Sequence, residues 1–216
     1  MKKLNKTGLL ALGVAAMTLS GAAMAEPLGL LNGRSADVSR SPDKSVEAGA
    51  VFGEFDDVDY TFFGARFNYK VNPLTVAYVD LGQAEYDFGA DFDGLAYGLG
   101  GFYQMDGVLD NTDFGIHASL HKTSLENSRF SGDVSVTSIM VEALFSGREA
   151  VNSQGTLFWN ASVGLNRTSG EGDSDTELAL GAGLTMPTAS QSGEFFAGVM
   201  HIDDLGFGAG YRHFLK

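Results

Sequence analysis

The feature that most constrains this chain is an alternation of apolar residues with small or polar ones, which recurs in strand-length segments. Successive side chains of a β-strand point to opposite faces, whereas a helix repeats every 3.6 residues. In residues 60–71, one face carries Phe63, Ala65, Phe67, Tyr69 and Val71, and the other carries Phe62, Gly64, Arg66, Asn68 and Lys70. No helical period follows residue 25, so the pattern predicts an all-β fold.

Segments of this kind succeed one another along the chain, separated by residues typical of turns. We expect ten strands, at about 45–55, 60–71, 74–83, 94–105, 113–122, 134–146, 156–166, 177–186, 193–201 and 205–216. The order predicts a closed, antiparallel, up-and-down β-barrel, with eight strands as the alternative count. The connections alternate between two sets. The set that includes residues 82–94 carries most of the acid and the longest insertions, and the other set includes residues 146–155.

The last segment, residues 205–216, has the features of a closing strand. Phe207 and Tyr211 share an apolar face, while Phe214 shares the other face with three glycines and Arg212. In a closed barrel this strand must pair with residues 45–55. Its inward face then aims Arg212 at the carboxylates of the lumen.

The first 25 residues are typical of a secretory signal peptide. Three lysines precede an apolar core of about a dozen residues, and residues 23–25 (Ala-Met-Ala) offer a cleavage site. Residues 26–44 show no period and carry two prolines, so we interpret them as a flexible leader. A plug in the lumen and a poorly patterned strand are the alternatives. Residues 45–216 form the barrel.

The mature chain, residues 26–216, is acidic. Of the 14 Lys and Arg residues, three leave with the signal peptide, so 11 remain against 27 Asp and Glu, a formal charge of −16. An acidic chain repels nucleic acid, and we expect no such partner. With no cysteine, the chain has no disulfides to stabilise it, which favours a closed fold.

The composition of the two faces distinguishes a membrane barrel from a soluble one. The polar face is mostly Gly, Ser, Ala, Asn and Thr, and the mature chain contains four lysines: Lys44, Lys70, Lys122 and Lys216. A soluble exterior of this size is normally rich in Lys, Glu and Arg. Large Leu, Val, Phe, Tyr and Trp residues on the apolar face suit contact with lipid. We therefore predict a transmembrane barrel, with a soluble lipocalin-like barrel as the alternative.

The signal peptide, the alternating strands and Phe214 near the C-terminus together resemble small Gram-negative outer-membrane β-barrel proteins, the class of OmpA, OmpX and OmpW. The resemblance implies an outer-membrane location and contact with membrane lipid and lipopolysaccharide. It also implies that the barrel-assembly machinery recognises the last strand, which in this class commonly ends in Phe. Here Leu215 and Lys216 follow Phe214, which departs from that pattern.

Several charged residues fall on the inward face of the predicted strands. The hypothetical lumen charge network consists of Arg66, Lys70, Asp80, Glu142, Glu177 and Arg212. Charges inside a narrow barrel must be paired or hydrated, so we expect the two arginines to pair with the two glutamates. Large and small residues alternate along the inward face, and this is the pattern found when side chains fill the interior of a small barrel. A mostly occluded lumen with a structural or interaction role is the expected function; a narrow porin or small-solute transporter is the alternative.

Acidic residues gather in the connections at one end of the predicted barrel. They are Asp56, Asp57, Asp59, Glu85, Asp87, Asp91, Asp93, Glu171, Asp173, Asp175 and Glu177. An even strand count with periplasmic termini puts these loops outside the cell. Carboxylates are ligands for Ca²⁺ and Mg²⁺, so divalent cations are candidate partners, although no loop matches the twelve-residue calcium pattern. Solvated acidic loops are the simpler expectation.

His117, Ser119 and His121 are the set that suggests catalysis. Their spacing places them on one strand face, with Glu126 a little further on. A His–Ser–acid set can activate a hydroxyl for ester hydrolysis, and the His-x-Ser spacing resembles outer-membrane lipid A deacylases. The phase of the strand points these side chains into the lumen and away from lipid. We therefore expect no enzyme, no catalytic residue, no cofactor and no defined metal site, with a lipid-modifying enzyme as the less favoured alternative.

Overall fold

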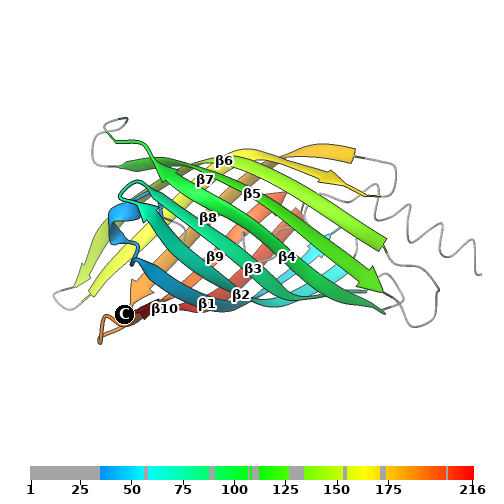
Figure 1. Ribbon diagram of the computed structural model, residues 1–216, viewed down its shortest axis with the longest axis horizontal. Coiled ribbons are helices and arrows are strands. Elements are labelled where there is room, and N and C mark those ends of the chain that lie inside the picture. Colours follow the sequence, from blue (N-terminus) through cyan, green and yellow to red (C-terminus); the bar gives the residue numbers. More distant parts are fainter. Residues whose placement is uncertain are drawn as a thin grey trace, which may run out of the picture.

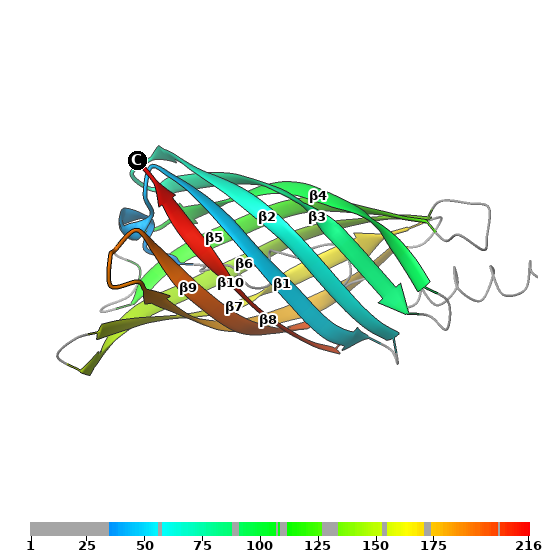
Figure 2. The ribbon, with the colours of Figure 1, turned by 90° about the horizontal axis from the view of Figure 1, so that it is seen from below.

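The computed structural model describes residues 35–55, 58–87, 91–106, 108, 112–126, 134–152, 155–170, 174–202 and 204–216. The predicted signal peptide lies outside these residues. The strands are β1 (Lys44–Phe55), β2 (Val58–Asn72), β3 (Thr75–Asp87), β4 (Asp91–Gln104), β5 (Asp113–Glu126), β6 (Val134–Asn152), β7 (Gly155–Ser169), β8 (Ser174–Pro187), β9 (Gly193–Ile202) and β10 (Asp204–Leu215). They form one closed barrel, seen from two sides in Figure 1 and Figure 2.

Every strand pairs with its neighbours in sequence, and the last strand closes the ring against the first. All ten pairings are antiparallel. β10 lies along β1 from Leu215 opposite Lys44 to Gly206 opposite Gly53. The prediction of a closed, ten-stranded, up-and-down barrel is confirmed, as is the pairing of its first and last strands.

The three aromatic residues singled out in β10 lie where the alternation puts them. Phe207 is half exposed on the outside. Tyr211 packs there against Phe195, with ring centroids 5.1 Å apart. Phe214 has the inward phase, and its backbone N–H donates to the carbonyl of Ser192 over 2.9 Å. The C-terminal end of β10 is thus tied to the connection between β8 and β9.

Some strands are longer than the alternation predicts, and their connections are shorter. β6 and β7 together cover most of the predicted loop at 146–155, and β3 and β4 cover most of the one at 82–94. At the ends of β3 and β4 the inward residues Ala84, Tyr86 and Phe92 are buried, but the outward positions carry polar residues such as Gln83, Glu85 and Asp93. The apolar outer face therefore ends before the strands do. The predicted long loops are in large part extensions of hairpins.

The two faces of the barrel wall differ in chemistry. Large apolar side chains are exposed on the outside, among them Phe63, Leu81 and Leu165, each more than half exposed. Their alternating neighbours point into the lumen, where Phe62 and Arg66 are almost fully buried. The assignment of faces made from the sequence therefore agrees with the structure. No helix among the described residues is long and apolar enough to cross a membrane.

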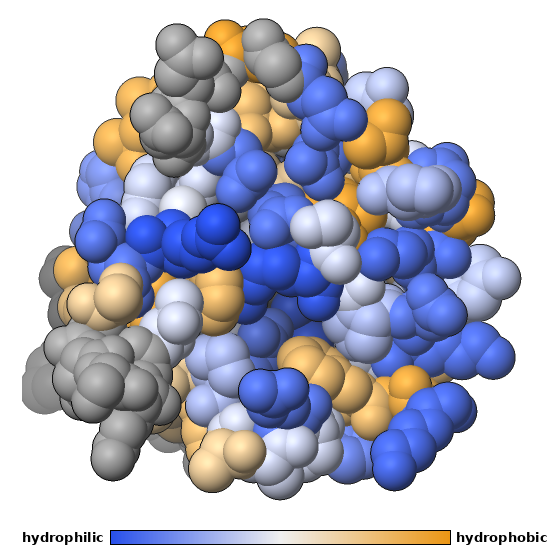
Figure 3. Space-filling view, turned by 90° about the vertical axis from the view of Figure 1, so that its left-hand side faces the viewer, coloured by the Kyte–Doolittle hydropathy of each residue, from blue (hydrophilic) through white to orange (hydrophobic). Residues whose placement is uncertain are grey.

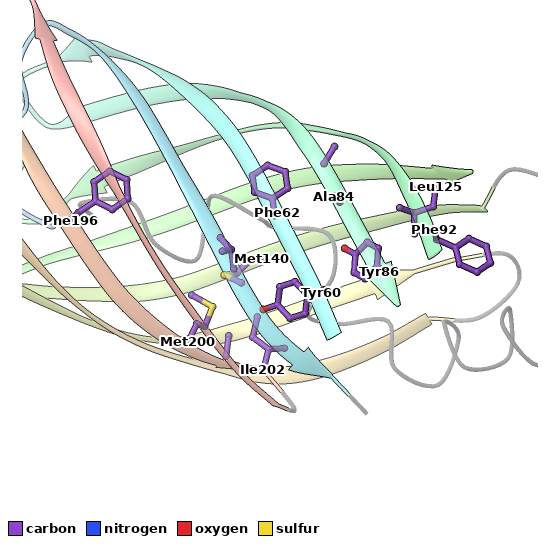
Figure 4. Packing of buried hydrophobic residues seen from close by; sticks show 13 residues of the cluster. Tyr60, Phe62, Ala84, Tyr86, Phe92, Leu125, Met140, Phe196, Met200 and Ile202 are labelled. Carbon is purple, nitrogen blue, oxygen red and sulfur yellow. The ribbon is translucent and has the colours of Figure 1, made fainter. Parts of the chain in front are cut away.

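Apolar side chains fill the part of the lumen remote from the C-terminus. Phe62, Met140 and Met200 belong to one buried cluster there (Figure 4). Tyr60 and Tyr86 belong to the same cluster and stack on each other, with ring centroids 6.1 Å apart. The cluster draws on strands from all round the barrel, so it packs the strands together from within.

Residues 35–43, which we call the plug, lie at the opposite end of the lumen, beside the C-terminus (Figure 1). They include the short 3-10 helix η2 (Val38–Arg40). Ala36 and Val38 are each 1% exposed. The N–H of Ala36 donates to Ser146 Oγ over 2.6 Å, and the N–H of Val38 donates to Gln104 Oε1 over 2.8 Å. This part of the leader predicted over 26–44 is therefore held by the wall; residues 26–34 lie outside the described residues.

Candidate functional site in the barrel lumen

A row of charged residues crosses the inner wall of the barrel. The register sets Glu194, Arg212, Glu47, Arg66 and Asp80 directly opposite one another on β9, β10, β1, β2 and β3. We call these five residues the charge row. The signs alternate from strand to strand, and none of the five is more than 8% exposed. Opposite charges that face each other across antiparallel strands attract, so the row favours the observed register.

Arg66 and Asp80 form a bidentate ion pair. Nε and Nη2 of Arg66 donate to the two carboxylate oxygens of Asp80, each over 2.6 Å. The guanidinium also lies over the ring of Tyr78, with Cζ 3.5 Å from the ring centroid. The Arg66 side chain has no exposed surface. Loss of either partner would therefore leave a buried charge without compensation.

Arg212 bridges two carboxylates. Its Nε donates to Glu47 Oε1 over 2.7 Å, and its Nη1 donates to Glu194 Oε1 over 2.6 Å. Asn68 Nδ2 donates to the same Glu47 oxygen over 2.6 Å. The second oxygen of Glu194 accepts from Arg40 Nη2 over 3.4 Å. Because Arg40 belongs to the plug, Glu194 joins the plug to the charge row.

Arg40 contacts two separate parts of the wall. Besides the ion pair with Glu194, its guanidinium lies over the ring of Phe158, with Cζ 3.1 Å from the ring centroid. Burial lowers the pKa of Arg40, while the carboxylates of Glu194 and Asp37 act in the opposite direction. The positive charge of Arg40 is thus held between an aromatic ring and a carboxylate, an arrangement that stabilises a cation.

His121 extends the charge row past a glycine. It lies on β5 opposite Gly98 of β4, and Gly98 lies opposite Asp80. A Cβ atom at Gly98 would come within 1.9 Å of the His121 ring. Because that position has no side chain, His121 Nε2 lies 2.6 Å from the carboxylate of Asp80. Gly98 is therefore needed for the contact.

A second buried chain of hydrogen bonds joins Glu142, His117 and Tyr78. His117 Nδ1 lies 2.7 Å from Glu142 Oε1, and Nε2 lies 2.6 Å from the Tyr78 hydroxyl. Phe102 stacks on the imidazole, with ring centroids 4.5 Å apart. Because both ring nitrogens are engaged and one ring face is covered, the imidazole is fixed in orientation.

The structure brings together part of the predicted lumen network. Arg66 and Asp80 bind each other, and Arg212 is in the same row. Glu142 is buried and binds His117 on another part of the wall. The predicted pairing of Arg66 with Glu142 or Glu177 is not the one formed, because the register places Asp80 opposite Arg66.

The other two residues of the predicted network are less buried. Lys70 lies on β2 near the plug and is partly exposed, and it makes no ion pair with any described residue. Glu177 lies on β8 and is also partly exposed. Both are near strand ends, where a side chain can reach water.

Glu194 belongs to the charge row, but the predicted lumen network did not include it. It falls in the weakly patterned segment 193–201, which has apolar residues on both faces. Its spacing of two from Phe196, which is buried, gives it the inward phase. This inward phase is the sequence feature from which a lumen position for Glu194 could have been predicted.

His117, Ser119 and His121 all face the lumen, as the phase of the strand predicts, and all three are buried. The two imidazoles bind the carboxylates of Glu142 and Asp80. The hydroxyl of Ser119 has no hydrogen-bond partner among the described residues. The contact between a hydroxyl and a base that would activate a nucleophile is therefore not made there.

Many acidic residues predicted for the loops lie at strand ends instead. Asp59, Glu85, Asp87, Asp91, Asp93, Asp175 and Glu177 are in β2, β3, β4 and β8, whereas Asp56, Asp57, Glu171 and Asp173 lie outside the described residues. Glu85 faces Asp93 across β3 and β4. Within the described parts of the chain, no group of three or more His, Cys, Asp or Glu residues could hold a metal ion.

No protein-family model matches the sequence, and no curated protein matches it. The chain is similar to the β domain of the Bordetella autotransporter BrkA, with a TM-score of 0.58 and 13% identity over 81% of this chain and 100% of that domain. It also matches the translocator domain of the autotransporter NalP from Neisseria meningitidis (TM-score 0.46, 12% identity, 82% and 90% covered). A third match is the outer membrane protein OprG from Pseudomonas aeruginosa (TM-score 0.37, 12% identity, 82% and 99% covered).

The likeness to the BrkA domain shows that the chain shares its overall fold, a closed β-barrel. This likeness does not specifically support the resemblance to the class of OmpA, OmpX and OmpW.

Proposed function

We propose that this protein is an integral outer-membrane β-barrel with a mostly occluded lumen and a structural or interaction role. The membrane location is supported by the outer surface, where large apolar side chains are exposed on successive strands. Examples are Leu81 on β3, Leu99 on β4, Val141 on β6, Leu165 on β7 and Leu178 on β8. A soluble protein does not normally expose so much apolar surface, whereas a barrel in lipid requires it. Closure of the sheet also pairs the backbone groups that lipid cannot satisfy.

The main support for an occluded lumen is that Glu194 contacts both the wall and the plug. This residue binds Arg212 of the wall and Arg40 of the plug. A path through the lumen would have to pass the plug, the charge row and the apolar cluster around Phe62. Displacing the plug would break this ion pair and the hydrogen bonds that Ala36 and Val38 donate to the wall, which opposes spontaneous opening.

The interaction role rests on the acidic strand ends at the end remote from the plug. An even strand count places both termini on the periplasmic side, so these acidic ends would face outside the cell. The carboxylates of Glu85 and Asp93 face each other there. Such pairs repel one another and attract cations, so divalent cations that bridge to lipopolysaccharide phosphates are candidate partners. The last strand, β10, is the candidate signal for the barrel-assembly machinery.

Conductance measurements test the occluded lumen. The folded protein is reconstituted in a planar lipid bilayer at several voltages, and we expect no stable unitary conductance. A variant with Arg40→Gln and Glu194→Gln, which removes the ion pair between plug and wall, serves as the comparison. Stable unitary conductance of the wild type would contradict the proposal and favour a narrow porin or small-solute transporter.

Cell fractionation tests the location separately. We expect the protein in the outer-membrane fraction, with a gel mobility that changes on boiling, since folded barrels resist denaturation by the detergent in the gel. Recovery from the soluble periplasmic fraction would contradict the membrane assignment.

A further inference from the structure

The apolar outer surface of the barrel gives way to polar residues at both ends. Figure 3 looks onto the plug end, where mostly hydrophilic residues surround the mouth of the barrel. At the end remote from the plug, the change falls after Leu120 on β5 and after Leu165 on β7, both of which are exposed. The next outward residue on each of these strands is a cation, Lys122 on β5 and Arg167 on β7. Such a boundary is the level at which lipid headgroups meet a membrane barrel.

The two cations lie at the same height on the barrel. Lys122 lies opposite Thr137 of β6, and Thr137 lies opposite Ser169 of β7, two residues beyond Arg167. Because the strands are tilted, a row of paired residues climbs away from the plug from β5 to β7 (Figure 1). At a tilt of about 35–45° the climb is about one residue per strand, so the offset of two residues over two strands brings the cations level. They therefore flank β6 at one headgroup level.

Neither cation has a carboxylate partner within the described parts of the chain. Lys122 makes no ion pair there. Arg167 donates from Nη2 to a hydroxyl, Ser174 Oγ, over 3.2 Å. The outward residues next to the cations are also hydroxyls, since Thr137 lies opposite Lys122 and Thr176 lies opposite Arg167. Ammonium, guanidinium and hydroxyl groups are all hydrogen-bond donors, so this surface is suited to an anion.

The opposite side of the same rim has the opposite charge. On β2, β3 and β4 the outward residues near the strand ends include Asp59, Glu85 and Asp93, all exposed. These carboxylates can hold a phosphate only through a divalent cation. Glu126 and Asp175, on β5 and β8, lie nearer the strand ends than the two cations do. The sector from β5 to β7 is therefore the part of the rim that can bind a phosphate directly.

We propose that Lys122 and Arg167 bind the phosphate of a phosphorylated lipid without a bridging metal ion. Charge-assisted hydrogen bonds to phosphate are strong, and a guanidinium can form two of them in parallel. The acyl chains of the lipid lie along Leu120, Ile139 and Leu165, which are exposed on the plug side of the cations. In the outer leaflet of an outer membrane, the lipid with this chemistry is the lipid A of lipopolysaccharide. The inference rests on the proposed membrane location and names one partner for the proposed interaction role.

A lipid titration of the folded protein in neutral detergent micelles, followed by native mass spectrometry, tests the inference. EDTA is present throughout, so no divalent cation can join a phosphate to the acidic strand ends. Lipid A is compared with dephosphorylated lipid A that has the same acyl chains. We expect the phosphorylated lipid to bind at least about 10-fold more tightly, because only this lipid accepts hydrogen bonds from the two cations through a phosphate.

Three results with the wild type would overturn the inference. Equal affinities for the two lipids would mean that the acyl chains alone are bound. Loss of binding in EDTA that excess Mg²⁺ restores would move the site to the acidic strand ends. Complete displacement of lipid A by millimolar inorganic phosphate would mean that the cations bind free phosphate and not a lipid.

Variants assign the binding to the two cations. Lys122→Gln and Arg167→Gln should each weaken the binding of lipid A about 10-fold and leave that of the dephosphorylated lipid unchanged. Lys44→Gln is the matched control, because it removes one exposed positive charge from β1 at the plug end, and it should leave both affinities unchanged. Equal losses in all three variants would show that net charge and not position governs binding, and would reject the site. Unchanged binding in Lys122→Gln and Arg167→Gln would also reject it.

Gel mobility before and after boiling establishes that each variant is folded, and the comparison of the two lipids on the wild type decides the question if a variant is not. Recovery of the protein from the soluble periplasmic fraction would contradict the membrane location and this inference together. An outer-membrane barrel that binds the two lipids equally would contradict this inference alone.

Discussion

Asp80→Asn is the substitution that most directly tests the energetic role of the charge row. Asparagine matches aspartate in size, so the cavity is unchanged, but the charge that receives two 2.6 Å bonds from Arg66 is removed. His121 loses its charged partner in the same step. The guanidinium of Arg66 remains without exposed surface, so water cannot replace the carboxylate.

The expected cost follows from what remains around Arg66. Loss of one partner from a buried ion pair costs about 3–5 kcal/mol. The Tyr78 ring contacts the guanidinium in the wild type and in the variant. This contact therefore does not contribute to the difference between their free energies of unfolding. Glu47 lies opposite Arg66 on the other side, and one of its carboxylate oxygens has no hydrogen-bond partner among the described residues. Because Glu47 offsets part of the lost charge, we expect the lower end of the range, about 3 kcal/mol.

Urea unfolding in lipid vesicles measures this cost. Folded and unfolded forms are separated by gel mobility without boiling, and the free energy of unfolding is compared with that of the wild type. Asp59→Asn, at an exposed strand end, is the control and should change it by less than about 0.5 kcal/mol. The double variant Asp80→Asn with Arg66→Met removes both charges and should recover stability to within about 1 kcal/mol of the wild type.

Two results would refute the reasoning about Asp80. One is a loss below about 1 kcal/mol in the single variant, which would mean that water reaches the pair. The other is a double variant less stable than the single one, which would mean that Arg66 contributes through packing more than through charge.

Three further predictions concern other contacts, and the first two use the same unfolding and gel assays. Gly98→Ala should destabilise the barrel by about 1–3 kcal/mol, because the added methyl group would overlap the His121 ring; an unchanged midpoint would mean that the ring moves freely. Leu180→Lys, near the middle of the outer face of β8, should cost about 2–4 kcal/mol in lipid, and Leu180→Ala should cost less; equal losses would count against a lipid-facing position. Glu194→Gln should speed tryptic cleavage after Arg40, measured by mass spectrometry, and an unaltered rate would show that the backbone contacts alone hold the plug.

The faces of the strands could be predicted from the sequence because alternation is a local property. Phe62 and Phe63 are adjacent and identical, yet one is buried in the lumen and the other is exposed on the outside. The neighbours Gly64 and Ala65 indicate which face points into the lumen, because small residues alternate with large ones on the inward face. No knowledge of the partner strands is required.

The pairings within the lumen could not be predicted in the same way, because they depend on register. A shift of two residues between β2 and β3 would preserve every face but place Tyr78 or Gly82 opposite Arg66 in place of Asp80. Turn geometry and the packing of the whole barrel fix the register, and neither is visible in a single segment.

The plug illustrates a second limit. Val38 is buried in a cluster with Val76, Tyr78 and Phe102, and its N–H donates to Gln104, which is 66 positions further along the chain. The residues around Val38 have no period of their own, so their burial depends entirely on a surface built elsewhere. Local pattern can identify such a segment as irregular, but it cannot tell a free leader from a docked one.

The charge row has a consequence for how the barrel is completed. A slip of two residues between β10 and β1 would move Arg212 from Glu47 to Gly49 or Ser45, and the buried charges of both strands would lose their match. The apolar outer face would tolerate that slip, since it would still present apolar residues outward. Closure in the wrong register is therefore penalised from inside the lumen, although the outer face alone would not distinguish it.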